Sequence, residues 1–437
     1  MTTDRQADVL VIGGGPAGST AASLLAQAGW QVTLVEKARH PRFHIGESLL
    51  PMNLAIFERL GVLDQVRAIG VHKPGAEFNS DDGKRVLFPF ARALQPDWPH
   101  AWQVRRSELD LLLLNRSREL GVQVLEEHRV SAVSLDDDGV QAQISGPQGG
   151  SIRARFLVDA SGRDTLLSKQ FGDKHSNKAH ASAALFGHFS NVPQREGVSA
   201  GVISIYWFEH GWFWMIPLQG DIVSVGAVCD PGYLKQRQVA PAEFLQQTLA
   251  LGPPELQQRM AAARAEGPVQ ATGNYSYTSA TMSGERFVKV GDAWAFVDPV
   301  FSSGVLLAMN SACGAAEYVD ARLKALPSAA AIRRRFEKRI RRGVREFSWM
   351  IARFNSPVMK HLFLAPQNPL RVQEAVISVL AGDVFRDNGV RWRYRLFRVI
   401  YYLNCLSRWS AIRAEWQRRR RRAQTRFSGG TLAEDEA

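Results

Sequence analysis

The sequence predicts an α/β protein with additional antiparallel β-structure: a Rossmann-like domain, an inserted substrate-side layer of β-sheet and a helical C-terminal region. Three observations predict this fold. The mostly apolar run of residues 8–12 (DVLVI) leads into GGGPAG and a helical stretch of residues 17–28, and a second apolar run ends at Glu36. Short strand-like segments separated by turns occupy residues 60–100 and 175–285. Strand, glycine turn, helix and strand in this order open a doubly wound sheet.

The composition is that of a globular protein. Of the 437 residues, 45% are hydrophobic and 22% are charged, and no run approaches the roughly 18 apolar residues of a membrane-spanning helix. The N-terminal residues enter a strand directly, without the pattern of a secretory signal. Cys229, Cys313 and Cys405 lie too far apart for a disulfide framework or a metal knuckle, so we expect no metal site. These features predict a cytoplasmic protein.

Positive charge is concentrated in the C-terminal quarter of the chain. Residues 327–437 hold 24 of the 54 Lys and Arg residues but only 9 of the 42 Asp and Glu residues. The net charge of +12 therefore arises in this quarter and says nothing about ligands of the preceding domain.

Gly13, Gly15 and Gly18 have the spacing of a dinucleotide-binding turn. Gly13 permits the tight turn, Gly15 lets the backbone approach a pyrophosphate, and Gly18 lets the helix pack closely on the strand. The helix N-terminus then directs free N–H groups at the anion. Glu36 follows Gly18 by 18 residues, where its carboxylate can accept hydrogen bonds from a ribose diol. A glycine turn alone need not bind a ligand, but strand, helix and acid together predict a dinucleotide site.

Two further segments favour FAD over NAD. Residues 157–163 read LVDASGR, and within residues 288–304 an apolar strand leads to Asp298 at the start of a helix. An acid at this place can bind the ribityl chain. The backbone N–H groups that follow, up to Gly304 and Val305, can face the pyrimidine edge of the isoalloxazine. A simple NAD-binding module needs neither segment.

Together these segments resemble the FAD-dependent monooxygenase-type flavoproteins. Besides the glycine turn and Glu36, the resemblance rests on VRRSELD at 104–110, DASG at 159–162 and GDAWAFVDP at 291–299. It implies that Arg106 lies near the flavin and that Val130 offers its backbone to the adenine. Further FAD contacts are implied for Ala17, Lys37 and Ser48.

Other motifs resemble those of flavin-dependent halogenases. Residues 212–217 read WFWMIP, which matches W-x-W-x-I-P, and residues 296–304 match F-x-x-P-x-x-S-x-G. Lys73 stands in an HKPGA segment where these enzymes carry an essential lysine, and residues 41–51 resemble the segment near their isoalloxazine ring. The resemblance covers roughly residues 5–365.

The resemblance implies a reaction that uses reduced FAD, O₂ and chloride or bromide. A flavin C4a-hydroperoxide oxidises the halide, and hypohalous acid travels to Lys73, which activates it or orients it toward an aromatic ring. Trp212 and Trp214 would keep the substrate away from the flavin. The turn at Ser303 and Gly304 would bind halide through backbone donors. Because the sequence has no obvious second nucleotide-binding turn, a separate flavin reductase would supply FADH₂.

Phe301 narrows the expected substrate. Tryptophan-halogenating members carry a glutamate at the matching position, proposed as the base that removes a proton from the ring intermediate. Since a phenol or pyrrole loses this proton more readily, Phe301 favours the phenol/pyrrole branch. Many members of that branch act on substrates tethered to a carrier protein.

Each of these residues also has a purely structural interpretation. Lys73 alone would more often be a solvated surface lysine, Trp212 and Trp214 would be core aromatics of a strand, and Ser303 would be a helix N-cap. The order in which the motifs occur favours the halogenase interpretation. An aromatic monooxygenase, a reductase of the geranylgeranyl type and a scaffold that keeps FAD only structurally remain as alternatives.

We predict an FAD-binding module over residues 1–325 and a basic, mostly helical region over residues 326–437. The substrate-side sheet is inserted into the module at the two strand-rich stretches named above. In the C-terminal region, apolar residues recur every four positions, as in an amphipathic helix, at Ile332, Phe336, Ile340 and Val344.

Two basic segments, residues 391–398 and 415–427, interleave arginine with aromatic side chains. This pattern suits an anionic partner, either an acidic acyl carrier protein or an anionic membrane surface, rather than nucleic acid. A solvated helix with a disordered end has the same composition. A membrane contact would make the cytoplasmic protein peripherally membrane-associated.

Overall fold

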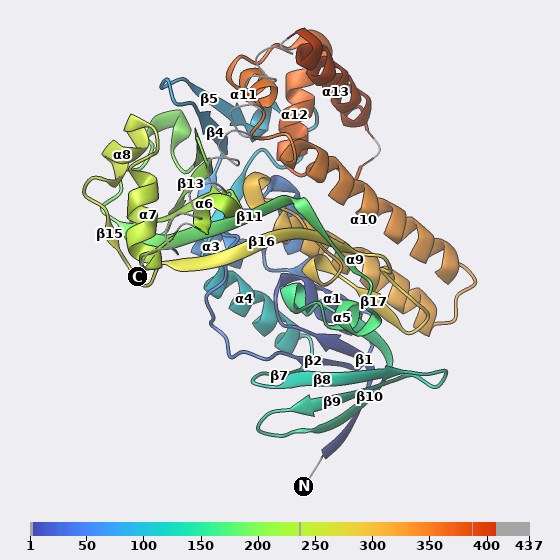
Figure 1. Ribbon diagram of the computed structural model, residues 1–437. Coiled ribbons are helices and arrows are strands. Elements are labelled where there is room, and N and C mark those ends of the chain that lie inside the picture. The colour runs from blue at the N-terminus through green and yellow to red at the C-terminus, as the bar shows by residue number, and fades with distance from the viewer. Residues whose placement is uncertain (1–2, 236, 387, 408–437) are drawn as a thin grey trace, which may run out of the picture.

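The computed structural model describes residues 3–407 except residues 236 and 387. Its architecture confirms the predicted combination of a Rossmann-like domain, an antiparallel sheet and C-terminal helices (Figure 1). β1 (Thr3–Ile12) lies between β2 (Val32–Val35) and β10 (Gly150–Asp159) and runs parallel to both. α1 (Pro16–Gln27) connects β1 to β2 and buries its small residues against α9 (Gly304–Leu323).

Further strands complete this first sheet. β7 (Gln123–Leu125) continues it in parallel beyond β2, and β17 (Phe287–Lys289) pairs in parallel with β10. β8 (Arg129–Leu135) and β9 (Val140–Ser145) form an antiparallel hairpin that adds to β10. The carboxyl ends of β1, β2 and β10 therefore meet at one edge, where an α/β sheet holds its ligands.

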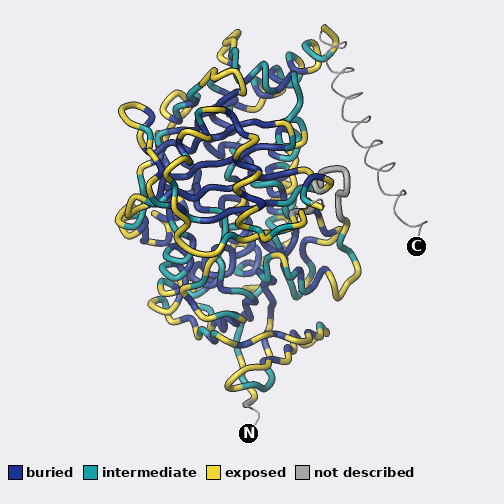
Figure 2. Tube along the Cα trace, turned by 60° about the vertical axis from the view of Figure 1, so that its left-hand side comes forward, coloured by how far each residue is buried: buried dark blue, intermediate teal, exposed yellow. Residues whose placement is uncertain are grey.

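A larger sheet is built from the two strand-rich stretches. In the described part of the chain it has nine strands: β4 (Gly75–Asn79), β5 (Arg85–Pro89), β11 (Lys174–Ser190), β12 (Ile203–Phe208), β13 (Gly211–Leu218), β14 (Ile222–Cys229), β15 (Arg264–Ala265), β16 (Gln270–Ser279) and β18 (Ala295–Phe296). Its neighbouring strands are antiparallel except β4 and β12. Figure 2 shows the middle of this sheet buried, where β4, β12, β13 and β14 are buried along nearly all of their length.

The two faces of this sheet serve different purposes. Side chains of a strand alternate between faces, so Phe213 and Met215 of β13 belong to one core, beneath α7 (Pro241–Leu249) and α8 (Pro254–Met260). Trp212 and Trp214 project to the opposite face and join the core shared with the first sheet. The sequence motif W-x-W thus directs both indoles toward the nucleotide-binding half.

Smaller elements link the two sheets. β3 (Gly70–Lys73) and β6 (Ala101–Val104) form a two-stranded antiparallel ribbon. The helices between the strands are α2 (Leu54–Leu60), α3 (Leu63–Ile69), α4 (Arg106–Glu119), α5 (Leu166–Phe171) and α6 (Pro231–Leu234). Single 3₁₀ turns include η5 (Gly291–Ala293) and η6 (Pro299–Phe301), which precede α9.

The C-terminal region is helical as far as it is described. It contains α10 (Ala329–Ile351), α11 (Pro357–Leu364), α12 (Val372–Leu380) and α13 (Val390–Ser407). The amphipathic pattern appears in α10, where Phe336, Ile340 and Val344 are buried in the core of the nucleotide-binding half and Ile332 packs against it. The division at residue 325 stays a prediction, since this core continues from α9 into α10.

Residues 408–437, which include the basic segment 415–427, lie outside the described residues. Among the described helices, none has the length and apolarity required to cross a bilayer.

Candidate active site

A cavity of about 1170 Å³ lies between the ligand-binding edge of the first sheet and the tryptophan face of the larger sheet. It gathers most of the residues that the sequence indicated for FAD and for the active site. Those that line it are Gly13, Gly15, Ala17, Glu36, Lys37, Ser48, Arg106, Val130, Trp212, Trp214, Gly304 and Val305. Gly18, Lys73, Asp298, Phe301 and Ser303 do not line it.

The glycine turn has the geometry of an anion site. A Cβ atom at Gly18 would lie 1.8 Å from the carbonyl oxygen of Gly13, which itself has φ of +104°, so both positions require glycine to close the turn. Gly15, the N-cap of α1, differs: a Cβ there would meet only the Arg42 guanidinium, at 3.6 Å. Open space, a helix N-terminus and a cation at Gly15 fit a pyrophosphate.

Glu36 is buried at the end of β2 and braces this turn. Its Oε2 accepts a hydrogen bond from the Gly14 amide at 2.6 Å, and its Oε1 accepts one from the Ala38 amide at 2.8 Å. Each carboxylate oxygen keeps a further lone pair for a ribose hydroxyl. Neighbouring Lys37 forms an ion pair with Asp164 at the rim of the cavity.

Arg106 is fixed before any ligand arrives. Its guanidinium donates to both oxygens of Asp110, at 2.8 and 3.0 Å, and to the Ile45 carbonyl at 2.7 Å. Burial, reinforced by the charge of Arg106, lowers the pKa of nearby His44 to about 4, so His44 is neutral at pH 7. This wall of the cavity therefore presents a fixed guanidinium beside a neutral imidazole.

Asp292 is an acidic residue of the cavity that the sequence analysis did not single out. It lies in η5 and lines the cavity, and burial raises the pKa of its carboxyl to about 6 against the opposing effects of Arg163 and Arg106. Asp298, selected from the sequence for the ribityl chain, caps η6 by accepting from the Val300 amide and also accepts from the Ser182 hydroxyl, at 2.7 Å. The Gly291-Asp292 pair in the GDAWAFVDP segment was the sequence signal that could have pointed to Asp292.

Lys73 is completely buried at the end of β3. Its ammonium donates to the Leu49 carbonyl at 2.8 Å and lies 5.2 Å from the centre of the Phe90 ring. Burial lowers the pKa of Lys73 to about 7. A solvated surface lysine, the structural interpretation of the sequence, is incompatible with this environment.

Two neighbouring residues, Ser48 and Leu49, separate Lys73 from the cavity. Ser48 lines the cavity, and the carbonyl of Leu49 accepts the hydrogen bond from Lys73. Ser48 pairs with Gln103 of β6. Both carry buried oxygens without a hydrogen-bond partner, the Ser48 Oγ and the Gln103 Oε1. Unpaired buried polar atoms are costly and often mark positions of water or ligand.

Phe301 and Ser303 do not line the cavity themselves, although their sequence neighbours Val300, Ser302 and Gly304 do. Phe301 packs edge-on against Phe354 at 5.3 Å and lies 6.3 Å from the Phe363 ring, in an aromatic cluster that also holds Phe78, Phe88, Trp207 and Trp212. Ser303 is the N-cap residue of α9, yet its buried hydroxyl caps no amide and has no partner.

Comparison with known proteins relates this arrangement to flavoproteins. The family described as FAD binding domain matches residues 6–333. A tryptophan 2-halogenase of Chondromyces crocatus is 36% identical over 73% of this chain and 62% of its own length. A flavin-dependent halogenase of Armillaria mellea is 34% identical, over 72% and 68%. A chlorinase of Pseudomonas fluorescens that acts on pyrrole-2-carbonyl groups of a peptidyl-carrier protein is 29% identical, over 88% and 90%. The chain thus spans less than two thirds of the first relative's length.

Solved structures give the same picture. A flavin-dependent brominase superposes with a TM-score of 0.81 at 26% identity, covering 91% of this chain and 99% of its own. A protein from Cytophaga hutchinsonii described as a flavoprotein/dehydrogenase superposes with a TM-score of 0.84 at 28% identity, covering 92% and 100%.

Proposed function

The chain belongs to the FAD-binding-domain family and, within it, to the flavin-dependent halogenases, and from this premise we propose that it halogenates an electron-rich aromatic substrate with FADH₂, O₂ and chloride or bromide. The observation that carries the proposal is the environment of Lys73. Its amine is buried, its pKa is lowered to about 7, and it bonds to Leu49, the residue after Ser48 in the wall of a cavity of dinucleotide size. A purely structural lysine would be stabilised by a carboxylate, whereas Lys73 contacts a carbonyl and an aromatic ring.

We assign FAD to the cavity on the fit of its residues. The α1 N-terminus with Gly15 and Arg42 would bind the pyrophosphate, Glu36 the adenosine ribose, and Val130 the adenine. The Asp292 carboxyl is placed to accept from the ribityl hydroxyls, a role that we prefer to give to it rather than to Asp298. When bound, reduced FAD supplies the oxygen-activating chemistry that oxidises a halide ion.

Halide would bind at the start of α9. Gly304 and Val305 line the cavity at this helix N-terminus, and the unpaired hydroxyl of Ser303 lies directly before them. N–H groups and a hydroxyl donor complement a small anion without a full positive charge. The site then holds halide where the flavin chemistry occurs.

Hypohalous acid formed in the cavity would pass the Ser48–Gln103 wall to Lys73. The two unpaired oxygens there offer it polar contacts. An amine with a pKa of about 7 exists in both protonation states near neutral pH, so it can either react with the acid or donate a hydrogen bond to it. Trp212 and Trp214 close the cavity against a bulky substrate.

The substrate would be a phenol or a pyrrole. No carboxylate base occupies the position of Phe301, and the surrounding cluster is aromatic, which suits a flat, apolar ring that loses its proton readily. Tethering to an acidic carrier protein is supported by the pyrrole chlorinase of Pseudomonas fluorescens, which acts on a carrier-bound group.

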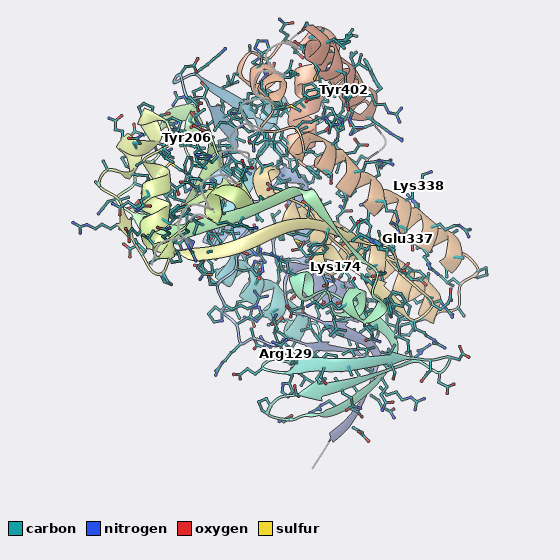
Figure 3. The ribbon with its side chains drawn as sticks, viewed as in Figure 1. Arg129, Lys174, Tyr206, Glu337, Lys338 and Tyr402 are labelled. Atoms are coloured by element: carbon teal, nitrogen blue, oxygen red, sulfur yellow. The ribbon has the colours of Figure 1, made fainter. Side chains whose placement is uncertain are left out.

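The test supplies chemically reduced FAD, O₂ and bromide to the protein with a phenol as probe. Wild type is expected to form bromophenol. Lys73→Met, which keeps the volume and removes the amine, is expected to lower bromophenol formation at least 100-fold while flavin oxidation continues. Lys338→Met on the exposed side of α10 is the matched control (Figure 3). A hydroxylated phenol, or bromophenol formation unchanged in Lys73→Met, would contradict the proposal.

A second part of the proposal concerns α13, whose outer face suits an anionic membrane. Its inner face packs Tyr394, Phe397 and Tyr401 into the core, yet its outer face also exposes apolar side chains, namely Trp392, Val399, Leu403 and Leu406. Tyr402 lies on the same end of the molecule (Figure 3). The helix contains four arginines and no acidic residue. Arginines beside an exposed apolar stripe are typical of interfacial helices.

Co-sedimentation with lipid vesicles tests this contact. Wild type is expected to bind anionic vesicles and not neutral ones, and Leu403→Ser with Leu406→Ser is expected to reduce binding at least fivefold. Replacing both with serine leaves the buried face of α13 intact. Binding to an acidic carrier protein with no binding to anionic vesicles would assign the surface to the carrier instead.

A further inference from the structure

The halogenation proposed above requires a proton inside the cavity, and we propose that Glu47 and His188 deliver it from solvent. The inference rests on the proposed function, because the proton is the one that halide oxidation consumes. FADH₂ + O₂ + X⁻ + H⁺ yields FAD + HOX + H₂O: oxygen gains four electrons, two from FADH₂ and two from the halide. One proton must therefore enter a buried cavity in each turnover.

Only one of the two carboxylate oxygens of Glu47 has a hydrogen-bond partner. Its side chain is 1% exposed and lines the cavity. The Oε1 lies 2.8 Å from the Nε2 of His188, whereas the Oε2 is buried without a hydrogen-bond partner. The backbone is held by the Val104 amide, which donates to the Glu47 carbonyl at 2.8 Å. A buried carboxylate oxygen left unpaired costs stability, so this side chain is arranged for a group that enters the cavity.

His188 connects this carboxylate to solvent. It lies on β11, its side chain is 18% exposed, and its ring contacts the ring of Phe43 edge-on at 5.6 Å. Phe43 is itself 43% exposed and lines the cavity. The imidazole thus lies against Phe43 with one nitrogen on Glu47, and an imidazole ring can relay a proton between its two nitrogens.

The other titratable groups of this wall do not offer the same connection. Arg42 and Arg106 carry guanidinium groups, which donate hydrogen bonds but accept none, and Arg106 is bound to Asp110. Burial holds His44 neutral at pH 7, with its pKa near 4 and its Nδ1 on the Ile45 carbonyl. Asp292, in η5, has a pKa of about 6 and approaches Arg163 and Arg106 rather than an exposed histidine. Among these groups of the wall, Glu47 and His188 form the pair that joins a partly exposed imidazole to a carboxylate in the cavity.

The test uses Glu47→Gln, which keeps the shape and the hydrogen bond to His188 but cannot exchange a proton as a carboxylate does. Transfer of two electrons from FADH₂ to O₂ gives FAD and H₂O₂ with no net proton uptake. Glu47→Gln is therefore expected to form at least tenfold less hypohalous acid and to release hydrogen peroxide instead, with flavin oxidation unchanged. His188→Gln is expected to act in the same direction.

Glu126→Gln is the matched control, since Glu126 forms another histidine–carboxylate pair, with His40 at 2.9 Å, and neither of these two residues lines the cavity. Thermal unfolding of the apo-protein and binding of oxidised FAD are measured for all variants. Both are expected to stay at wild-type values in Glu47→Gln, and added formate is expected to restore hypohalous acid in Glu47→Ala.

The outcomes separate the two proposals. A wild-type protein that makes no hypohalous acid contradicts the halogenase function. A wild type that makes it while Glu47→Gln makes as much overturns only the proton pathway. Loss of FAD binding or of thermal stability in Glu47→Gln, without peroxide release, would mean that the pair merely joins the 41–48 segment to β11.

Discussion

The cavity and the surroundings of Lys73 differ in how their charged side chains are placed. The cavity sets Glu36, Arg42, Arg106 and Asp292 around an open volume of about 1170 Å³, and its charges face a space that a ligand can fill. Lys73 sits in a closed, apolar environment where one carbonyl and one aromatic ring are its partners. The two regions are separated by Ser48 and Leu49.

The difference shows where each region's stability comes from. In the cavity, polar side chains form hydrogen bonds and ion pairs with each other, and a bound ligand would supply further partners. At Lys73, the fold keeps an amine that burial destabilises, without a carboxylate to compensate it. An amine in this environment suits the proposed catalytic role of Lys73 better than a stabilising one, and the following predictions test that contrast.

The largest effect is expected at the glycine turn, where stability and binding can be separated. Gly18→Ala places a Cβ 1.8 Å from the Gly13 carbonyl oxygen, so it is expected to lower the free energy of unfolding by more than about 3 kcal/mol. Gly15→Ala meets no backbone and is expected to lower it by less than about 1 kcal/mol, yet to weaken FAD binding at least tenfold by filling the pyrophosphate site.

Urea unfolding of the apo-proteins and fluorescence titration with FAD measure the two quantities. Equal losses of stability in the two variants would contradict the distinction between a glycine that closes the turn and one that leaves room for a ligand.

The same contrast explains what the sequence could predict. The glycine turn and Glu36 belong to one contiguous strand–turn–helix–strand unit, so local spacing was sufficient to predict them. The burial of Lys73 was not readable from HKPGA, because it depends on the pairing of β3 with β6 and on the distant Leu49.

Other features of the site also depend on contacts that the sequence does not reveal. Asp292 follows β17 and Asp298 follows β18, and only the geometry of η5 and η6 determines which carboxyl lines the cavity. The aromatic packing of Phe301 comes from Phe354, in the turn between α10 and α11, and from Phe363, within α11. Contacts between residues this far apart leave no local pattern in a single sequence.

Removing the charge of Lys73 is expected to stabilise the protein. Because the folded-state pKa of about 7 lies below the ordinary 10.5, the protonated amine is penalised on folding, and stability falls as the pH drops from 10.5 toward 7. Lys73→Met is therefore expected to raise the free energy of unfolding by about 2 to 3 kcal/mol at pH 7, with the gain disappearing near pH 10. Urea unfolding at both pH values checks this, and a destabilised variant at pH 7 would mean that the amine is a structural contact.

A smaller gain in stability with the same origin is expected for Asp292→Asn, together with weaker FAD binding, which Lys73→Met is not expected to cause. Its folded-state pKa of about 6 exceeds the ordinary 3.8, so ionisation is penalised on folding and stability falls as the pH rises through this range. Asp292→Asn is expected to stabilise the apo-protein by about 1 to 2 kcal/mol at pH 7.5 and by less at pH 4.5. FAD binding should weaken at the same time, because an amide accepts hydrogen bonds less strongly than a carboxylate. If stability and FAD affinity instead fell together, Asp292 would be holding the fold rather than the flavin, and the contrast between an open cavity awaiting its ligand and a closed site around Lys73 would lose its best support.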